Sequence, residues 1–185
     1  MSRSNPYKKA KREAKKTILF YGEGEAESIF LKHLKKMYAN NSGIAVTIRN
    51  GHGGTAEIIV HKAIQYPGDF DRRVVVLDND KLKQEMEQAR KLAGKCEIDL
   101  IENTPCLEAL LQSIVDGGKP KMNKSSAQYK KNFEKNHICK EKRLDPREYE
   151  KLFTIKLLDK RRKEIKNLEV IIGFMEGGFE ESNED

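Results

Sequence analysis

The stretch Thr17-Ile18-Leu19-Phe20-Tyr21-Gly22 is almost entirely apolar and runs directly into the acidic segment Glu23-Gly24-Glu25-Ala26-Glu27. A second apolar stretch, Arg73-Val74-Val75-Val76-Leu77, runs directly into Asp78-Asn79-Asp80. Short, unbroken apolar runs are typical of parallel strands that helices cover on both faces. In open parallel sheets, ligands bind outside the carboxyl ends of the strands. Both acidic segments are therefore predicted to lie where an α/β protein binds its ligands.

The acidic residues at these strand ends predict a site for a divalent cation. Carboxylates gathered in one place repel one another, so they need a cation or shared protons to coexist. Mg²⁺ prefers hard oxygen ligands and keeps several waters, and Mn²⁺ is the alternative ion. We expect Glu23, Asp78 and Asp80 to be catalytic and to bind the metal, with Glu27 as a further ligand from the first turn of a helix. Two such ions can promote cleavage of a phosphodiester.

Each acidic segment also has a simpler interpretation. Acids favour helix N-termini because of the helix macrodipole, and this explains Glu25 and Glu27 without a metal. Asp78-Asn79-Asp80 is equally compatible with a strand-to-helix turn that contains an N-cap. Two acidic segments at equivalent strand ends are more informative than either one alone.

The order of apolar and polar segments predicts an alternation of strands and helices. Such an alternation is the mark of a parallel sheet between two layers of helices. In the second of these helices, Ile58, Ile59, Ala63 and Ile64 are expected to face the sheet, and Thr55 is its expected N-cap. Strands are expected at 17–21, 44–49, 73–77 and within 97–102, and helices at 26–38, 56–65, 81–92 and 106–114.

With 185 residues, the chain is expected to form one domain with a modest appendage. The predicted α/β domain covers residues 17–115 and follows a basic arm at 1–16. A basic, helical extension at 116–175 is expected to pack on the core, and Asp145-Pro146 is a typical helix start within it. Residues 176–185 form an acidic tail.

Positive charge is concentrated in the opening residues and after residue 118, within a net charge of +7. This asymmetry favours a nucleic-acid partner, although any single basic run is also compatible with a solvated helix face. The glycine loop Gly51-His52-Gly53-Gly54 opens a helix, a place that binds phosphate. It lacks the lysine and spacing of a Walker A loop, and a plain turn is the simpler explanation. The residues expected to contact nucleic acid are Lys8, Lys9, His52, Gly53, Lys81, Lys130, Lys131, Arg161 and Arg162.

Composition argues against several other classes of protein. No apolar segment approaches the length of a membrane span, and no apolar segment of the signal-peptide kind follows the polar, basic N-terminus. Cys96, Cys106 and Cys139 are few and irregularly spaced, which favours reduced thiols over a disulfide framework. Without a Cys-x-x-Cys pair, no zinc site is expected. We therefore expect a cytoplasmic protein that is not bound to a membrane.

The motifs together resemble a known family. Strand-Glu23-Gly24-x-x-Glu27 followed by strand-Asp78-x-Asp80 resembles the Toprim fold of primases, topoisomerases and overcoming-lysogenization-defect nucleases. The match to the RloB-like family is closer and rests on three segments in order. Family members typically have Asn directly before Pro in the third segment, whereas Thr104 intervenes here. The segments are Phe20-Tyr21-Gly22-Glu23-Gly24-Glu25, Val76-Leu77-Asp78-Asn79-Asp80 and Asn103-Thr104-Pro105-Cys106-Leu107-Glu108-Ala109-Leu110-Leu111.

The resemblance implies a small Toprim nuclease of prokaryotic defence loci, commonly encoded beside an AAA-type or ABC-type ATPase. It implies that Glu23 is a ligand or general base and that Asp78 and Asp80 hold the metal. Glu27 and Glu108 are further candidate ligands, although Glu108 is equally compatible with a helix-start acid. We therefore predict a Mg²⁺-dependent nuclease that cleaves DNA or RNA as an effector of anti-phage defence under the control of a partner ATPase.

Other functions and assemblies remain compatible with the sequence. The main alternative is a non-catalytic nucleic-acid-binding or adaptor subunit that retains the fold. A transferase-like or ligase-like role has less support, because no tyrosine lies in a context typical of a nucleophile. A homodimer is compatible with either function.

Overall fold

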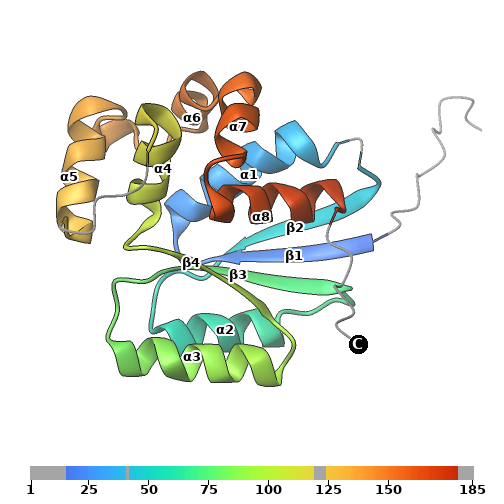
Figure 1. The fold of residues 1–185 in the computed structure, drawn as a ribbon. Coiled ribbons are helices and arrows are strands. Elements are labelled where there is room, and N and C mark those ends of the chain that lie inside the picture. Colours follow the sequence, from blue (N-terminus) through green and yellow to red (C-terminus); the bar gives the residue numbers. More distant parts are fainter. Residues whose placement is uncertain (1–15, 41, 119–123, 179–185) are drawn as a thin grey trace, which may run out of the picture.

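The structure is a computed structural model that describes residues 16–40, 42–118 and 124–178. The predicted basic arm, with Lys8 and Lys9, lies outside the described residues except for Lys16, and so does most of the predicted acidic tail. The described chain is an α/β structure in which helices cover both faces of one sheet (Figure 1).

The sheet has four strands, all parallel, in the order β2-β1-β3-β4 (Figure 1). This arrangement confirms the predicted fold class and is consistent with a Toprim-like fold. The register pairs Gly22 with both Asn50 and Val76, and it pairs Asp78 with Asn103. The carboxyl ends of the strands therefore meet at one edge of the sheet. The strands are β1 (Lys16–Gly22), β2 (Ile44–Asn50), β3 (Arg72–Asp78) and β4 (Asp99–Asn103).

The helices form one layer on each face of the sheet (Figure 1). One layer is α2 (Ala56–Gln65) and α3 (Lys83–Lys95), and the other contains α1 (Glu25–Tyr38), α4 (Leu107–Asp116) and α8 (Lys166–Glu176). The remaining elements pack outside this second layer, beside α1 and α4. They are α5 (Ser126–Asn136), the short 3-10 helix η1 (Lys140–Lys142), α6 (Pro146–Leu152) and α7 (Ile155–Arg162).

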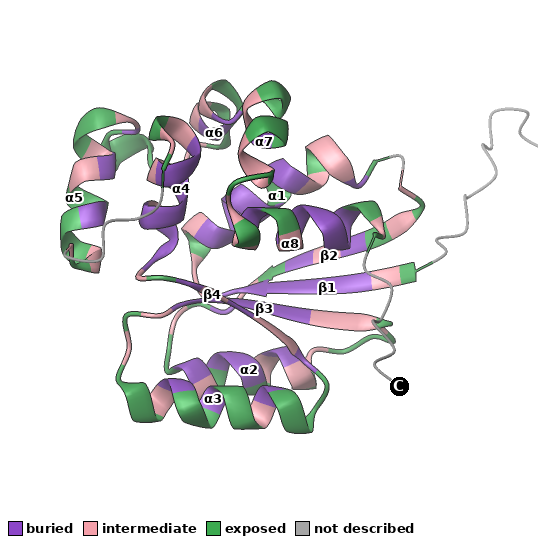
Figure 2. Cartoon of the chain, in the orientation of Figure 1, coloured by how far each residue is buried: buried purple, intermediate pink, exposed green. Residues whose placement is uncertain are grey.

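The apolar runs of β1 and β3 are unbroken because both faces of these strands are buried. Successive side chains of a strand point to opposite faces. In β3, Val74 and Val76 join the core beneath α1, α4 and α8, whereas Val75 and Leu77 join the core beneath α2 and α3. Figure 2 shows the resulting buried bands along β1 and β3.

The helical extension shares the core of the sheet. Phe153, Leu158 and Ile172 come from the region after residue 115, and they belong to the same buried cluster as Phe20 and Val76 of the sheet. Asp145 caps α6 as expected, with its Oδ1 accepting a hydrogen bond from the Arg147 N–H at 2.9 Å. The last described helix, α8, therefore packs on the same face of the sheet as α1 and α4.

One core prediction for α2 is wrong. The helix has the predicted bounds, and Thr55 caps it by accepting a hydrogen bond from the Ile58 N–H at 3.3 Å. Ile58, however, is 46% exposed. The buried positions 56, 59, 60 and 63 follow the i, i+3, i+4, i+7 spacing of one helix face. Position 58 lies off that face, so its side chain points away from the sheet.

The cysteines and the helices can be compared with the expectations for disulfides and for membrane spans. Cys96, Cys106 and Cys139 are all free cysteines. Within the part of the chain that the structure describes, no helix is long and apolar enough to cross a membrane.

A single aromatic contact tests whether the extension and the sheet domain unfold together. Phe153, at the end of α6, is fully buried against Phe30 of α1, with ring centroids 5.4 Å apart. Replacing Phe153 with Ala should lower the free energy of unfolding by roughly 3–5 kcal/mol, because it leaves a large cavity. Urea denaturation measures this change. The exposed Ile155 provides the matched control, and Ile155→Ala should change it by less than about 0.5 kcal/mol. Equal effects of the two substitutions would contradict a shared core.

Candidate functional site

Glu23 and Glu27 are placed at the carboxyl edge of the sheet by the tight junction between β1 and α1. The Glu23 N–H donates to the Val76 carbonyl at 3.1 Å, which continues the pairing of β1 with β3. Gly22 has to be small, because a Cβ at this position would lie 2.9 Å from the Cβ of Glu27. Glu27 Oε2 accepts a hydrogen bond from the Gly24 N–H at 3.0 Å. Glu27 therefore caps its own helix, as the simpler interpretation expects, and it also faces the ends of the strands.

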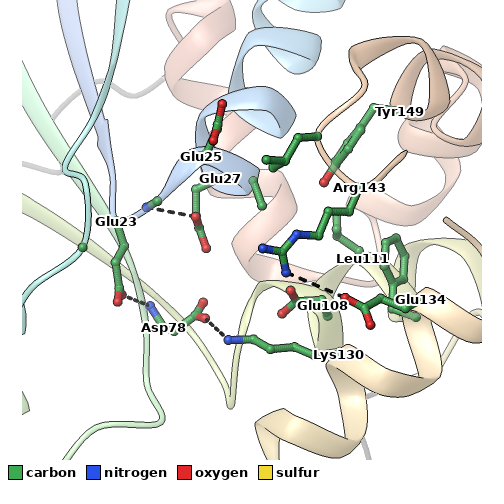
Figure 3. A pocket seen from close by; sticks show the side chains of 15 residues that line it. Glu23, Glu25, Glu27, Asp78, Glu108, Leu111, Lys130, Glu134, Arg143 and Tyr149 are labelled. Carbon is green, nitrogen blue, oxygen red and sulfur yellow. Dashed lines mark hydrogen bonds and ion pairs between the residues drawn. The ribbon is translucent and has the colours of Figure 1, made fainter. Parts of the chain in front are cut away.

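Asp78 links β3 to both Glu23 and α4. Its Oδ1 accepts a hydrogen bond from the Leu107 N–H at the start of α4, at 2.8 Å. Its own N–H donates to Glu23 Oε2 at 3.2 Å (Figure 3). The two acidic segments that the sequence places at separate strand ends are thus joined by direct hydrogen bonding.

Asp78, Cys106 and Glu108 form a group that can hold a metal ion. One ligand atom of each residue lies within 4.8 Å of those of the other two. Among the described residues, nothing forms a hydrogen bond with the buried Oε2 of Glu108 or with the buried side-chain amide of Asn103. Buried polar atoms are normally paired, so unpaired oxygens beside carboxylates fit a site that a cation and its waters would satisfy.

Electrostatics at this site are unfavourable without a cation. Burial raises the pKa of Asp78 to about 8, and repulsion from Glu27 and Glu108 adds to the shift, while the Leu107 N–H opposes it. Burial likewise raises the pKa of Glu27, and repulsion from Glu23 and Glu108 contributes. The Lys130 ammonium lies 3.9 Å from Asp78 Oδ2, which is too far for a hydrogen bond. A divalent ion would relieve this repulsion directly.

The thiol in the group favours a hard cation over one that needs a thiolate. Burial raises the pKa of Cys106 to about 12, so this thiol keeps its proton at neutral pH. Thiolate is the form that binds soft metals, whereas carboxylates suit magnesium, calcium and manganese. The oxygen atoms of Asp78 and Glu108 are therefore the better ligands.

Of this group, Asp78 and Glu108 line one side of a cavity of about 280 Å³. Its acidic side comes from the carboxyl edge of the sheet and from the starts of α1 and α4. Its other side comes from α5, α6 and the segment between them (Figure 3). The polar side chains on that second side are Lys130, Glu134, Arg143 and Tyr149.

The structure brings together four of the five expected metal ligands. Glu23, Glu27, Asp78 and Glu108 all line the cavity. Asp80 is exposed; it does not line this cavity or belong to the group of ligand atoms described above. It lies two residues beyond the end of β3, where the chain has already turned toward α3.

Among the expected nucleic-acid contacts of the loops, Gly53 lines the cavity and His52 is exposed beside it. Lys81, another of the expected contacts, is hydrogen-bonded within the protein. Its Nζ donates to Glu23 Oε1 at 2.8 Å and to the Gly54 carbonyl at 3.1 Å. Lys81 therefore fixes Glu23 and the glycine loop relative to each other.

Among the expected contacts of the extension, Lys130 lines the cavity and Lys131 is exposed on the same helix. Arg161 and Arg162 are held within the protein. Arg161 donates to the Ile114 carbonyl at 3.0 Å and pairs with Glu164. Arg162 pairs with both Glu169 and Glu176. These two arginines tie α7 to α4 and α8, and they do not line the cavity.

Arg143 and Tyr149 are cavity residues that the sequence did not single out. They are more than a hundred residues from Glu23, in a region whose many charged residues look alike in sequence. Only the packing of the extension against α1 brings them to the site. Asn103 lay within a recognised motif, and its pairing with Asp78 was foreseeable only from the sheet register.

No protein family, curated protein or solved structure matches this chain. A function for this chain is therefore proposed from its sequence motifs, its fold and the geometry of the cavity.

The buried carboxyl of Asp78 gives the protein a defined pH dependence. Its pKa rises from 3.8 to about 8 on folding, so the folded state retains a proton that the unfolded chain releases. The stability present below about pH 4 is therefore lost as the pH rises to about 8. In EDTA, thermal melting should show wild type losing stability across this range more steeply than Asp78→Asn, whose side chain stays neutral.

Asp80→Asn is the matched control for this measurement, because Asp80 is exposed only two residues away. It should follow wild type at every pH. If the melting temperatures of wild type and Asp78→Asn changed with pH in the same way, Asp78 would ionise in the folded protein without loss of stability.

Proposed function

We propose that this chain is a Mg²⁺-dependent or Mn²⁺-dependent nuclease of the Toprim type, which hydrolyses phosphodiester bonds in DNA or RNA. The observation that carries the proposal is the convergence of Glu23, Glu27, Asp78 and Glu108 on one cavity at the carboxyl edge of a parallel sheet. Four carboxylates in such a place are costly unless they bind a cation. Nucleases commonly use carboxylate-bound divalent ions for this chemistry.

The residues of the chain divide between holding the ion and positioning the groups around it. Asp78 and Glu108 are the proposed principal ligands, because their oxygens lie close together and one of them has no protein partner. Glu27 faces the same space while it caps α1. A bound divalent ion supplies Lewis-acid activation of water and neutralises charge on the phosphate.

Glu23 is the proposed general base or additional ligand. Lys81 and the Asp78 N–H hold its two carboxylate oxygens in place. A side chain fixed in this way keeps one orientation while substrate binds, which favours a role in positioning or in accepting a proton. Asp80, which is exposed and does not line the cavity, is proposed as a ligand for a metal ion that arrives with the substrate.

The biological setting is proposed from the resemblance to the RloB-like family. The segments that carry it include Glu23, Asp78 and Glu108, three residues that line the cavity. On this basis we propose that the nuclease acts in anti-phage defence and is controlled by an AAA-type or ABC-type ATPase.

One observation favours the alternative of a non-catalytic nucleic-acid-binding or adaptor subunit. Asp80, the second acid of the Asp-x-Asp motif, lies outside the ligand group. A chain that had lost catalysis would still bind nucleic acid through its basic surface, with a strong dependence on salt. The experiment below separates the two functions.

Divalent ions should stabilise the protein and support cleavage through Asp78. With wild type, Mg²⁺ or Mn²⁺ at millimolar concentration should raise the melting temperature, and plasmid DNA or tRNA should be cut. Asp78→Asn and Glu108→Gln should each reduce the cleavage rate by at least about a hundredfold, because each removes a ligand charge. Both substitutions should also abolish the metal-dependent rise in melting temperature.

Glu87→Gln is the control for this experiment, since it removes one negative charge from an exposed position on α3. It should leave both measurements unchanged. Salt-sensitive binding without cleavage of any substrate, with the candidate ATPase present as well, would favour the adaptor function.

A further inference from the structure

The wall of the cavity that faces the carboxylates contains three hydrogen-bond donors from the helical extension. Lys130 comes from α5, Arg143 follows η1, and Tyr149 comes from α6. Figure 3 shows the Arg143 guanidinium and the Tyr149 hydroxyl directed toward the space that Glu27 and Glu108 face. The cavity therefore has one acidic side and one side that offers donors.

Tyr149 is a buried residue whose hydroxyl is directed into the cavity (Figure 3). The residue is only 2% exposed, yet it lines the cavity. Within the described ranges, no residue forms a hydrogen bond with its hydroxyl. Burial, together with the nearby Glu108 and Glu27, raises the pKa of Tyr149, so the phenol keeps its proton. A hydroxyl that is directed into the cavity and has no acceptor within the described part of the protein can donate to a ligand there.

The two cations of this wall are only loosely paired. Arg143 Nη1 lies 3.7 Å from Glu134 Oε1, and Lys130 Nζ lies 3.9 Å from Asp78 Oδ2. Both distances exceed the range of a hydrogen bond. The guanidinium has five N–H donors and the ammonium has three, so both groups retain donors for an anion. The tight pairs of Lys81 and Arg162 elsewhere leave no comparable freedom.

We propose that Lys130, Arg143 and Tyr149 bind the phosphate group of the nucleic acid, opposite the carboxylates. This inference rests on the proposed function and names the residues that hold its substrate. Guanidinium and phenol donors suit the non-bridging oxygens of a phosphate. The carboxylates alone would repel that phosphate, so the wall acts together with a divalent cation bound between the two sides. Phosphate binding should therefore require a divalent ion.

The size of the cavity agrees with a ligand of this kind. Its volume of about 280 Å³ lies just below the range for small-molecule sites, which is about 300–1,000 Å³. The space therefore suits one phosphate with its attached sugar at a time.

Binding measured without turnover tests this wall. The probe is a fluorescein-labelled single-stranded oligonucleotide of ten nucleotides, as DNA and as RNA, with Ca²⁺ in place of Mg²⁺ and fluorescence anisotropy as the readout. Arg143→Gln should weaken Ca²⁺-dependent binding by roughly 10-fold to 100-fold, as expected for a lost charge-assisted hydrogen bond. Tyr149→Phe should weaken it by roughly 2-fold to 10-fold, as expected for one neutral hydrogen bond.

Arg147→Gln is the matched control, because Arg147 is an exposed arginine on α6 that does not line the cavity. It should change binding by less than about twofold, in line with a surface substitution. The Mg²⁺-dependent rise in melting temperature should persist in Arg143→Gln and in Tyr149→Phe, because neither removes a carboxylate.

The outcomes separate this inference from the proposed function. Equal losses for Arg143→Gln and Arg147→Gln, with Tyr149→Phe unchanged, would overturn the phosphate-binding wall even if wild type cuts its substrate. A selective loss in Arg143→Gln and Tyr149→Phe, in a protein that cuts nothing, would support the wall and reject hydrolysis. Tyr149→Phe keeps the ring and its packing, so it remains informative if Arg143→Gln folds poorly.

Discussion

The feature on which the site depends is the repulsion among carboxylates buried at one edge of the sheet. Asp78, Glu27 and Glu108 share a cavity in which burial and mutual repulsion raise the pKa of Asp78 to about 8. The fold accepts this cost because the strands fix where the backbone ends, and the Leu107 N–H holds Asp78 in place. Strain of this kind, retained at the carboxyl edge of a parallel sheet, is typical of functional sites. It is the physical reason to expect a cation there.

The helical extension is part of the site as well as part of the core. Phe153 packs against Phe30 of α1, and His33 of the same helix is hydrogen-bonded to the Phe153 carbonyl at 2.7 Å. These contacts anchor the end of α6, the helix that carries Tyr149. A packing interaction far from the acids thus determines where a polar group meets them. Stability and the shape of the cavity depend on the same contacts.

The fold could be predicted from sequence because its main signal is local. The apolar runs of β1 and β3 are long enough and unbroken enough to indicate strands buried on both faces, and the acids that follow them mark the edge. The buried face of α2 was harder to predict, because Ile58 is apolar but lies off the face that Ile59 and Ala63 define. Arg143 and Tyr149 could not be predicted, because their place depends on the tertiary packing of the extension.

The positions of the basic residues show why net charge does not locate a binding surface. Lys81 and Arg162 were reasonable candidates for phosphate contacts, yet each is bonded to carboxylates of the protein itself. A cation that already has close acceptors gains little from a phosphate, because it must first give up those hydrogen bonds. Among the described residues, Arg143 pairs only with Glu134, at 3.7 Å, and it lies near the Tyr149 phenol. The cations with unsatisfied donors, rather than the most basic segments, therefore identify the side of the cavity suited to an anion.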